Sequence, residues 1–151
     1  MIEKERNVLV LCTQNSARSQ MAEAFLRKHG GAGFRVYSAG MEPTEIHPLA
    51  ARVMDESGVP LGGQRSKGVG EYLGKLAVHD LIVVCARTER ECPKLFPGAL
   101  NHHFWPFPDP AAVEGPIEKK LAAFRDVRDR IGRRVLEWLE TTDGDPKRGR
   151  R

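Results

Sequence analysis

The sequence predicts one α/β domain, in which a small, mostly parallel sheet is flanked by helices in a three-layer arrangement. Short, continuously apolar runs at residues 7–11 and 80–84 are typical of strands buried on both faces of a parallel sheet. Segments with three- and four-residue apolar spacing, typical of amphipathic helices, lie between such runs. A length of 151 residues, 40% of them hydrophobic, suits a single globular domain. Alternation of strands and helices favours a parallel sheet with both faces covered.

Each expected element has its own boundary signals. The run 7–11 ends at Cys12, helical spacing begins at Ser19, and glycines at positions 30 and 31 stop that helix. Residues 34–38 alternate like a strand, and glycine and proline close the helix that follows it. The full expectation is strands at 7–11, 34–38, 80–84 and 102–105, helices at 19–30, 48–57 and 116–140, and a weak helical segment at 71–76.

The basic surplus of the chain is small. The formal charge is +4 and the pI is about 9.1. Part of this surplus stands at the very end of the chain, at Lys147, Arg148, Arg150 and Arg151. We therefore expect a catalytic domain at 1–140, a solvated basic tail at 141–151, and no nucleic-acid partner.

No targeting segment is visible, because the apolar run from Val8 to Cys12 is far shorter than the roughly 20 residues that cross a bilayer. The cysteine count is three, and an odd count argues against an extracellular disulfide framework and for reduced thiols. We expect a cytoplasmic monomer that makes no membrane contact.

The segment from Cys12 to Ser19 stands where an open α/β sheet binds ligands, after a strand and before a helix N-terminus. Backbone N–H groups of such a loop converge on a tetrahedral oxyanion, and the helix dipole and the Arg18 guanidinium favour negative charge there. The same field is expected to lower the pKa of Cys12 and make its thiolate an in-line nucleophile. Ser19 is expected to donate to the sulfur. The expected oxyanion-binding residues are Thr13, Gln14, Asn15, Ser16, Ala17 and Arg18.

A plainer interpretation makes Cys12 a small buried residue at a strand end and Arg18 a surface residue, since this spacing also arises by chance. The order of strand, cysteine, small or polar residues, arginine, serine and helix favours the functional interpretation. Asp109, in a loop between two prolines, fits it as the acid for a departing oxygen. By itself, however, an Asp-Pro pair is more often an ordinary turn.

The other two cysteines follow the strand at 80–84. Cys85 ends it at the same sheet edge as Cys12, and Cys92 comes seven residues later in a polar stretch, so the two thiols can meet on a flexible loop or a short helix. Zinc is a poor alternative because the sequence has no C-x2-C pair and its histidines lack ligand spacing. An inert core cysteine stays an alternative for Cys85 and is less natural for Cys92.

Three segments together resemble the low-molecular-weight tyrosine phosphatase superfamily. They are Cys12 to Ser19, Tyr37 to Gly40, and Asp109-Pro110. The resemblance covers nearly the whole chain up to about Glu140 and implies a four-stranded parallel sheet flanked by helices. Within the superfamily the sequence is most similar to the thioredoxin-coupled arsenate reductases. The matching segments are residues 15–23, Val84-Cys85 followed by Cys92-Pro93, and residues 109–111.

The resemblance implies a relay of thiols. Cys12 attacks arsenate held by the loop and Arg18, and Asp109 protonates the departing oxygen. Cys85 then attacks Cys12 and arsenite leaves. Cys92 next attacks Cys85, and thioredoxin reduces the resulting Cys85–Cys92 disulfide. Phosphate and sulfate are expected to compete for the loop, and no bound cofactor is expected.

Two loop positions depart from the family pattern: Gln14 stands where glycine is common, and Ala17 stands where a cysteine is common.

A third departure concerns potassium. Some reductases of the family bind this ion through residues that match Asn15, Glu23 and Ser38 together with an acidic residue, and the fourth position is Lys67 here. Because a lysine ammonium can replace the ion, we expect no potassium. The alternative is that Lys67 merely points to solvent.

Two other functions stay open on sequence alone. A low-molecular-weight protein tyrosine phosphatase needs the same loop and Asp109. The residues after Asp109 are Pro-Ala-Ala, however, without the aromatic neighbours that commonly hold a phosphotyrosine ring, and Cys85 and Cys92 would lack a purpose. A non-catalytic module that binds anions or nucleic acid would use the basic surplus and would not need Cys12.

Overall fold

The computed structural model describes residues 6–95 and 98–141, with the backbone alone described at 32, 91–95 and 141. Four parallel strands form one sheet in the order β2-β1-β3-β4, which confirms the expected sheet. The tail expected over 141–151 lies, apart from Thr141, outside the described residues. The strands are β1 (Arg6–Cys12), β2 (Phe34–Gly40), β3 (Asp80–Val83) and β4 (Asn101–Phe104).

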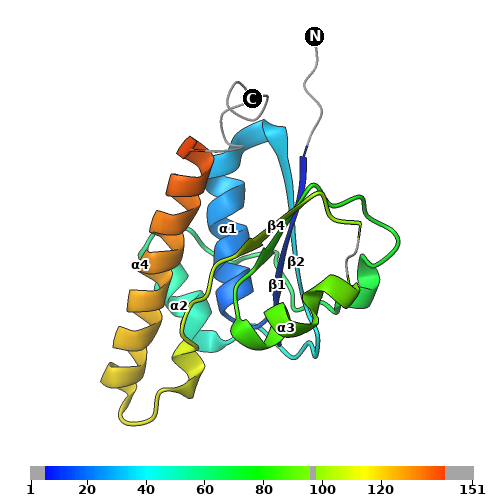
Figure 1. Cartoon of the computed structure of the whole chain (residues 1–151). Coiled ribbons are helices and arrows are strands. Elements are labelled where there is room, and N and C mark those ends of the chain that lie inside the picture. Colours follow the sequence, from blue (N-terminus) through cyan, green and yellow to red (C-terminus); the bar gives the residue numbers. More distant parts are fainter. Residues whose placement is uncertain (1–5, 96–97, 142–151) are drawn as a thin grey trace.

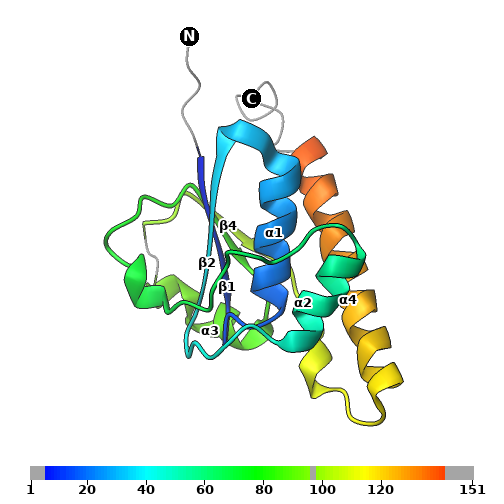
Figure 2. The same cartoon turned by 180° about the vertical axis from the view of Figure 1, so that it is seen from behind.

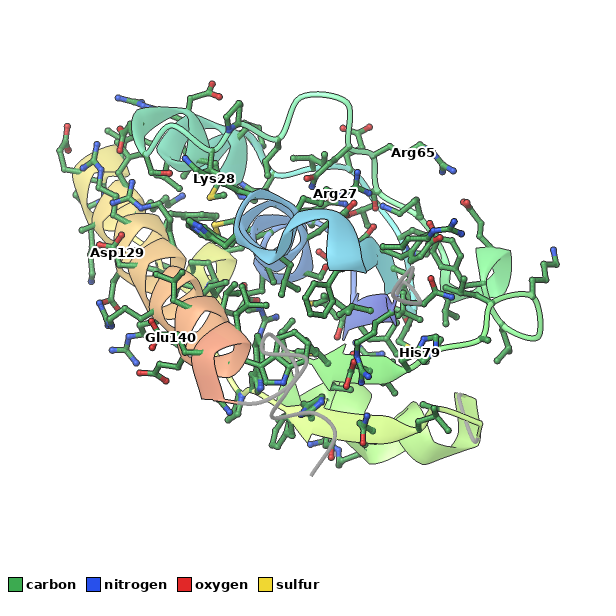
Figure 3. The ribbon with its side chains drawn as sticks, turned by 90° about the horizontal axis from the view of Figure 1, so that it is seen from above. Arg27, Lys28, Arg65, His79, Asp129 and Glu140 are labelled. Atoms are coloured by element: carbon green, nitrogen blue, oxygen red, sulfur yellow. The ribbon has the colours of Figure 1, made fainter. Side chains whose placement is uncertain are left out.

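Helices cover both faces of this sheet, as the two opposite views show (Figure 1, Figure 2). Three of them, α1, α2 and α4, pack together on one face, and α3 lies on the other; seen from above, the three gather on one side (Figure 3). The α-helices are α1 (Arg18–Gly30), α2 (Pro48–Glu56), α3 (Ala86–Leu95) and α4 (Ile117–Thr141). Short 3-10 turns are η1 (Gly31–Gly33), η2 (Val69–Glu71) and η3 (Pro110–Ala112).

The side chains of β1 alternate between two apolar clusters, as the pleat of a strand requires. Val8, Val10 and Cys12 belong to the larger cluster, which α1, α2 and α4 complete. Leu9 and Leu11 belong to a smaller cluster on the opposite face. Burial on both faces explains why the strand is continuously apolar, and it fixes the strand's register.

The helix expected at 71–76 is wrong. The 3-10 turn η2 ends at Glu71, and turns follow it. Gly74 has a φ of 76°, which is outside the helical region, so a helix cannot continue through it. Tyr72 and Leu76 nevertheless pack against the smaller cluster, which accounts for their apolar spacing.

The parallel sheet brings two cysteines to one edge. Leu11 of β1 pairs with Val83 of β3, so Cys12 and Cys85 follow neighbouring strands at the same carboxyl edge. The segment between β4 and α4 brings Asp109 to this edge as well. Across the described ranges, no helix combines the length and apolar character needed to span a bilayer.

Candidate active site

A cavity of about 330 Å³ opens at the carboxyl edge of the sheet. The helices α1 and α3 both begin at this edge (Figure 1). Four of the expected catalytic residues line it: Cys12, Arg18, Cys85 and Asp109. Of the other expected oxyanion-binding residues, Thr13, Gln14, Ser16 and Ala17 line it too. The structure therefore brings together a cysteine, an arginine, an acid and a helix N-terminus, which is a combination suited to a tetrahedral anion.

The loop after Cys12 lies tightly against the end of β2. A Cβ added to Gly40 would lie only 2.7 Å from the backbone nitrogen of Asn15 and 2.8 Å from the carbonyl oxygen of Thr13, so only glycine fits there. Asn15 has a φ of 52°, in the left-handed region that asparagine tolerates better than most residues. These two residues fix the curvature of the loop.

The side chain of Asn15 is fully buried and hydrogen-bonds to other buried groups outside the cavity. Its Nδ2 donates to Ser19 Oγ at 2.8 Å and to Ser38 Oγ at 2.9 Å. Its Oδ1 accepts from Gln20 Nε2 at 2.9 Å and from the backbone N–H of Lys67 at 2.8 Å. Asn15 thus holds the shape of the loop through its side chain, and only its backbone can face an anion.

Ser19 is also fully buried and lies beneath the loop. Its hydroxyl accepts from Asn15, and within the described part of the chain no hydrogen bond joins it to the Cys12 sulfur. In this geometry Ser19 supports the loop rather than the nucleophile.

Arg18 and Asp109 approach each other at the mouth of the cavity, with 3.9 Å between Arg18 Nη2 and Asp109 Oδ2. Arg18 Nη1 also donates to the carbonyl oxygen of Phe107 at 3.0 Å, which positions the guanidinium. The Asp109 Oδ1 atom accepts from the backbone N–H of Ala111 at 3.0 Å and so begins η3. The side chain of Asp109 is 47% exposed, so its second oxygen can reach a bound anion.

The thiols of Cys12 and Cys85 are both buried and line the same cavity. The neighbouring Cys85 thiol and burial raise the pKa of Cys12, and the nearby Arg18 charge offsets them only partly. The neighbouring Cys12 thiol lowers the pKa of Cys85 to about 4 against the effect of burial. The direction of the Cys12 shift is therefore the opposite of the expected one, because the two thiols titrate as a pair.

Two hydroxyl groups form hydrogen bonds with Cys85. Thr13 Oγ1 lies 3.2 Å from the Cys85 sulfur, and Thr88 Oγ1 lies 3.0 Å from it. Both stabilise a thiolate at Cys85. Sequence reasoning missed Thr88. It also missed Ala86 and Arg87, both of which line the cavity. These residues could have been predicted by the rule already applied to the loop after β1. In an open parallel sheet, the first residues of a helix that follows a strand lie at the edge where ligands bind.

Cys92 lies on α3, the helix that starts directly after Cys85. Of the two alternatives for the segment between Cys85 and Cys92, a flexible loop or a short helix, the backbone forms the helix. The side chain of Cys92 lies outside the described residues.

Lys67 does not point to solvent, since its side chain is only 8% exposed. Its Nζ lies 3.5 Å from Asn15 Oδ1 and 3.4 Å from Ser38 Oγ. It also lies 3.7 Å from Glu23 Oε1 and donates to the carbonyl oxygen of Arg65 at 2.7 Å. Because the ammonium sits among the oxygens that would hold potassium, these residues do not fit the ion.

The model of the low molecular weight phosphotyrosine protein phosphatase family matches residues 7–148, and the chain belongs to this family. Among curated relatives, the arsenate reductase of Bacillus licheniformis is 39% identical over 138 residues, which is 91% of this chain and 97% of the relative. The arsenate reductase of Halalkalibacterium halodurans is 41% identical over 135 residues, 89% of this chain and 95% of the relative.

Solved structures show the same likeness. An arsenate reductase in the phosphate binding state superposes with a TM-score of 0.71 at 29% identity, over 87% of this chain and 95% of the other. The tyrosine phosphatase Wzb from Escherichia coli K30, in complex with sulphate, has a TM-score of 0.75 at 23% identity over 90% of this chain and 97% of the other. At that identity the second likeness establishes the fold alone.

Proposed function

We propose that the chain reduces arsenate to arsenite with electrons from its own thiols. The observation that carries the proposal is that Cys12 and Cys85, at the ends of neighbouring strands, line the same anion-binding cavity. A hydrolase of this family needs one thiol for a covalent intermediate, whereas a reductase needs a second thiol within reach of the first. Relatives named arsenate reductase, at 39% and 41% identity over most of the chain, support the same function.

The reaction begins at Cys12. Its proton passes to the neighbouring Cys85 thiol, and the thiolate attacks arsenic while the loop and Arg18 hold the oxygens. A sulfur–arsenic bond forms, an arsenic–oxygen bond breaks, and Asp109 supplies the proton with which that oxygen leaves as water. Arsenic is still pentavalent in this adduct.

The electron transfer occurs in the second step. Cys85 attacks the sulfur of Cys12, a disulfide forms, and the electron pair of the sulfur–arsenic bond moves to arsenic. The proton of Cys85 passes to an arsenite oxygen. Arsenic becomes trivalent and leaves, and the two thiols have together lost two electrons.

Cys92 then attacks Cys85, which frees Cys12 and leaves a Cys85–Cys92 disulfide. Seven residues of helix rise by roughly 10 Å, whereas the Cα atoms of a disulfide lie within about 7 Å, so α3 has to unwind for this step. Unwinding brings the disulfide outward, where a dithiol protein of the thioredoxin class reduces it. We place the reaction in the cytoplasm, where such reductants keep thiols reduced, and we propose a monomer.

Phosphotyrosine hydrolysis is the second candidate, because the same loop and Asp109 serve a phosphocysteine intermediate. Ala111 stands beside Asp109 in the cavity wall, and within the described residues none of the side chains lining that wall is aromatic. The cavity thus offers no ring to hold a phosphotyrosine side chain. We expect weak hydrolysis of aryl phosphates, because phosphate resembles arsenate in shape and charge.

Arsenite formation by the wild type and by the variants Cys12→Ser, Cys85→Ser and Cys92→Ser tests the proposal, with thioredoxin and its reductase recycling the thiols. Each variant should lose turnover, and Cys85→Ser should still hydrolyse an aryl phosphate because Cys12 remains. A wild type that forms no arsenite, or normal turnover in Cys85→Ser and Cys92→Ser, contradicts it.

A further inference from the structure

Beneath the anion-binding loop lies a cluster of buried polar side chains that touches none of the reacting atoms. Its members, which we call the underloop cluster, are Asn15, Ser19, Gln20, Glu23, Ser38 and Lys67, and each is at most 7% exposed. Burial of so many polar groups is costly unless every one of them is bonded. We therefore ask what role the underloop cluster has besides packing, and the charged members of the cluster indicate that role.

The negative charge of the cluster belongs to Glu23, whose side chain is 2% exposed. Its Oε2 atom pairs with Arg27, and its Oε1 accepts from Ser38 and lies 3.7 Å from Lys67 Nζ. Each carboxylate oxygen thus has its own cation. Without Lys67, one side of a buried carboxylate would be left unneutralised close to a loop that has to bind an anion.

The positive charge at that oxygen comes from Lys67 alone among the described cations. Arg27 and Arg65 lie on the same flank of the molecule (Figure 3), but both are engaged elsewhere. Arg65 forms two hydrogen bonds with Glu71. Arg27 is occupied with the other Glu23 oxygen and the carbonyl oxygen of Val36. Neither guanidinium can take over the place of the Lys67 ammonium without giving up these partners.

Lys67 is also coupled to the loop itself. Its Nζ and its backbone N–H both approach Asn15 Oδ1, at 3.5 and 2.8 Å, and Asn15 is the described non-glycine residue with a left-handed backbone. The backbone bonds of Lys67 to Asn15 and Gly40 persist in any side-chain variant. Changes at the side chain therefore isolate what the ammonium contributes.

We propose that Lys67 is a positioning residue whose ammonium serves as a tethered internal cation, which fixes Asn15 and neutralises Glu23 so that the loop binds its oxyanion without an external monovalent cation. Four oxygens lie 2.7 to 3.7 Å from Nζ, and they are hard donors of the kind that alkali ions also use. The Lys67 ammonium and an alkali ion cannot both occupy this space, because their positive charges would repel each other. The proposal rests on the proposed function only in that the loop binds an oxyanion.

Truncation of the side chain should exchange the internal cation for an external one. Lys67→Ala leaves room among the oxygens, and Lys67→Met removes the charge but fills the space. Inorganic phosphate is the probe, and its affinity is measured by calorimetry in potassium chloride and in tetramethylammonium chloride at equal ionic strength. The exposed Lys75→Ala is the matched control for the loss of one charge.

The wild type and Lys75→Ala should bind phosphate equally in both salts. Both Lys67 variants should lose about tenfold in phosphate affinity in tetramethylammonium, as is usual when a group supporting a binding site is removed. Potassium should restore most of the affinity of Lys67→Ala and none of that of Lys67→Met. The proposal is overturned if both Lys67 variants bind phosphate as tightly as the wild type in tetramethylammonium. It is also overturned if potassium changes the phosphate affinity of Lys67→Ala and of Lys67→Met by the same factor.

The wild type provides a test that survives misfolding of the variants. If its phosphate affinity or its melting temperature rises in potassium compared with tetramethylammonium, an external cation binds and the proposal is overturned. Phosphate binding does not require arsenate reduction. A chain that binds phosphate but forms no arsenite would therefore refute the proposed function without touching the role of Lys67.

Discussion

The hydroxyl of Thr88 lies 3.0 Å from the sulfur of Cys85, and both residues are buried. The backbone N–H of Thr88 also lowers the pKa of Cys85. Because Cys85 directly precedes α3, its sulfur lies at the positive end of the helix dipole, which favours a thiolate there. In the proposed mechanism, Thr88 thus helps Cys85 to carry the charge with which it attacks the Cys12 adduct.

Thr88→Val should raise the pKa of the first thiol to ionise. Valine keeps the shape of the side chain but cannot donate to a thiolate, and one lost hydrogen bond corresponds to about one pH unit. The measurement is the ultraviolet absorbance of the thiolate against pH in a Cys92→Ser background. Thr44→Val, at an exposed position, is the control. An ionisation that stays at its wild-type pH would show that Thr88 does not stabilise the thiolate.

Gly40→Ala should disrupt the anion-binding loop. The new Cβ would lie within 2.8 Å of backbone atoms of Thr13 and Asn15, and backbone atoms cannot move aside as a flexible side chain can. We expect at least tenfold weaker phosphate binding and a free energy of unfolding lower by about 1–3 kcal/mol. Calorimetry and urea unfolding measure the two effects. A Cβ at Gly62 meets nothing within 4 Å, so Gly62→Ala is the control. Equal behaviour of the two variants would contradict the close approach.

The parts of this site that were predictable from sequence depend on strand direction. The apolar runs ending at Cys12 and Cys85 predict parallel strands, and parallel strands bring their carboxyl ends to one edge. The helical pattern after Ser19 similarly places Arg18 at a helix N-terminus. Residues far apart in the chain are thereby brought into one cavity without knowledge of any side-chain contact.

The parts that were not predictable depend on side-chain contacts across that edge. Which thiol ionises first depends on the neighbouring thiol and on the hydroxyl groups of Thr13 and Thr88, which the sequence pattern does not place beside Cys85. The direction of the Asn15 side chain depends on hydrogen bonds to residues on β2, on α1 and in the segment before η2. No periodicity in the sequence distinguishes a buried, fully bonded Lys67 from an exposed lysine.

Asp80 should make the stability of the protein depend on acid pH. Burial favours its neutral form, but hydrogen bonds from His103 and Arg6 outweigh burial and hold the pKa of Asp80 below its usual value. A carboxyl of this kind stabilises the folded state above its unfolded pKa and loses that contribution as the pH falls through the folded pKa. The free energy of unfolding should therefore decline below about pH 4.

Asp80→Asn identifies this contribution, because asparagine does not titrate. The variant should be less stable than the wild type at neutral pH, and the gap should narrow as the pH is lowered toward 2. Urea unfolding at a series of pH values measures the difference in the free energy of unfolding between variant and wild type at each pH. The exposed Asp55→Asn is the control. A gap that stays constant across the acid range would rule out Asp80 as the titrating group.

Asp109→Asn should separate proton donation from anion binding. Asparagine retains the oxygen that accepts from Ala111 at 3.0 Å, so η3 keeps its capping hydrogen bond, but the amide cannot protonate a departing oxygen. We expect the rate of arsenite formation to fall by roughly 10²- to 10⁴-fold. Phosphate affinity should be kept or slightly increased, because a negative charge 3.9 Å from Arg18 is removed. Single-turnover kinetics and calorimetry measure the two quantities, and Asp126→Asn on the exposed face of α4 is the control. If Asp109→Asn formed arsenite at the wild-type rate, the proton would have to come from another group.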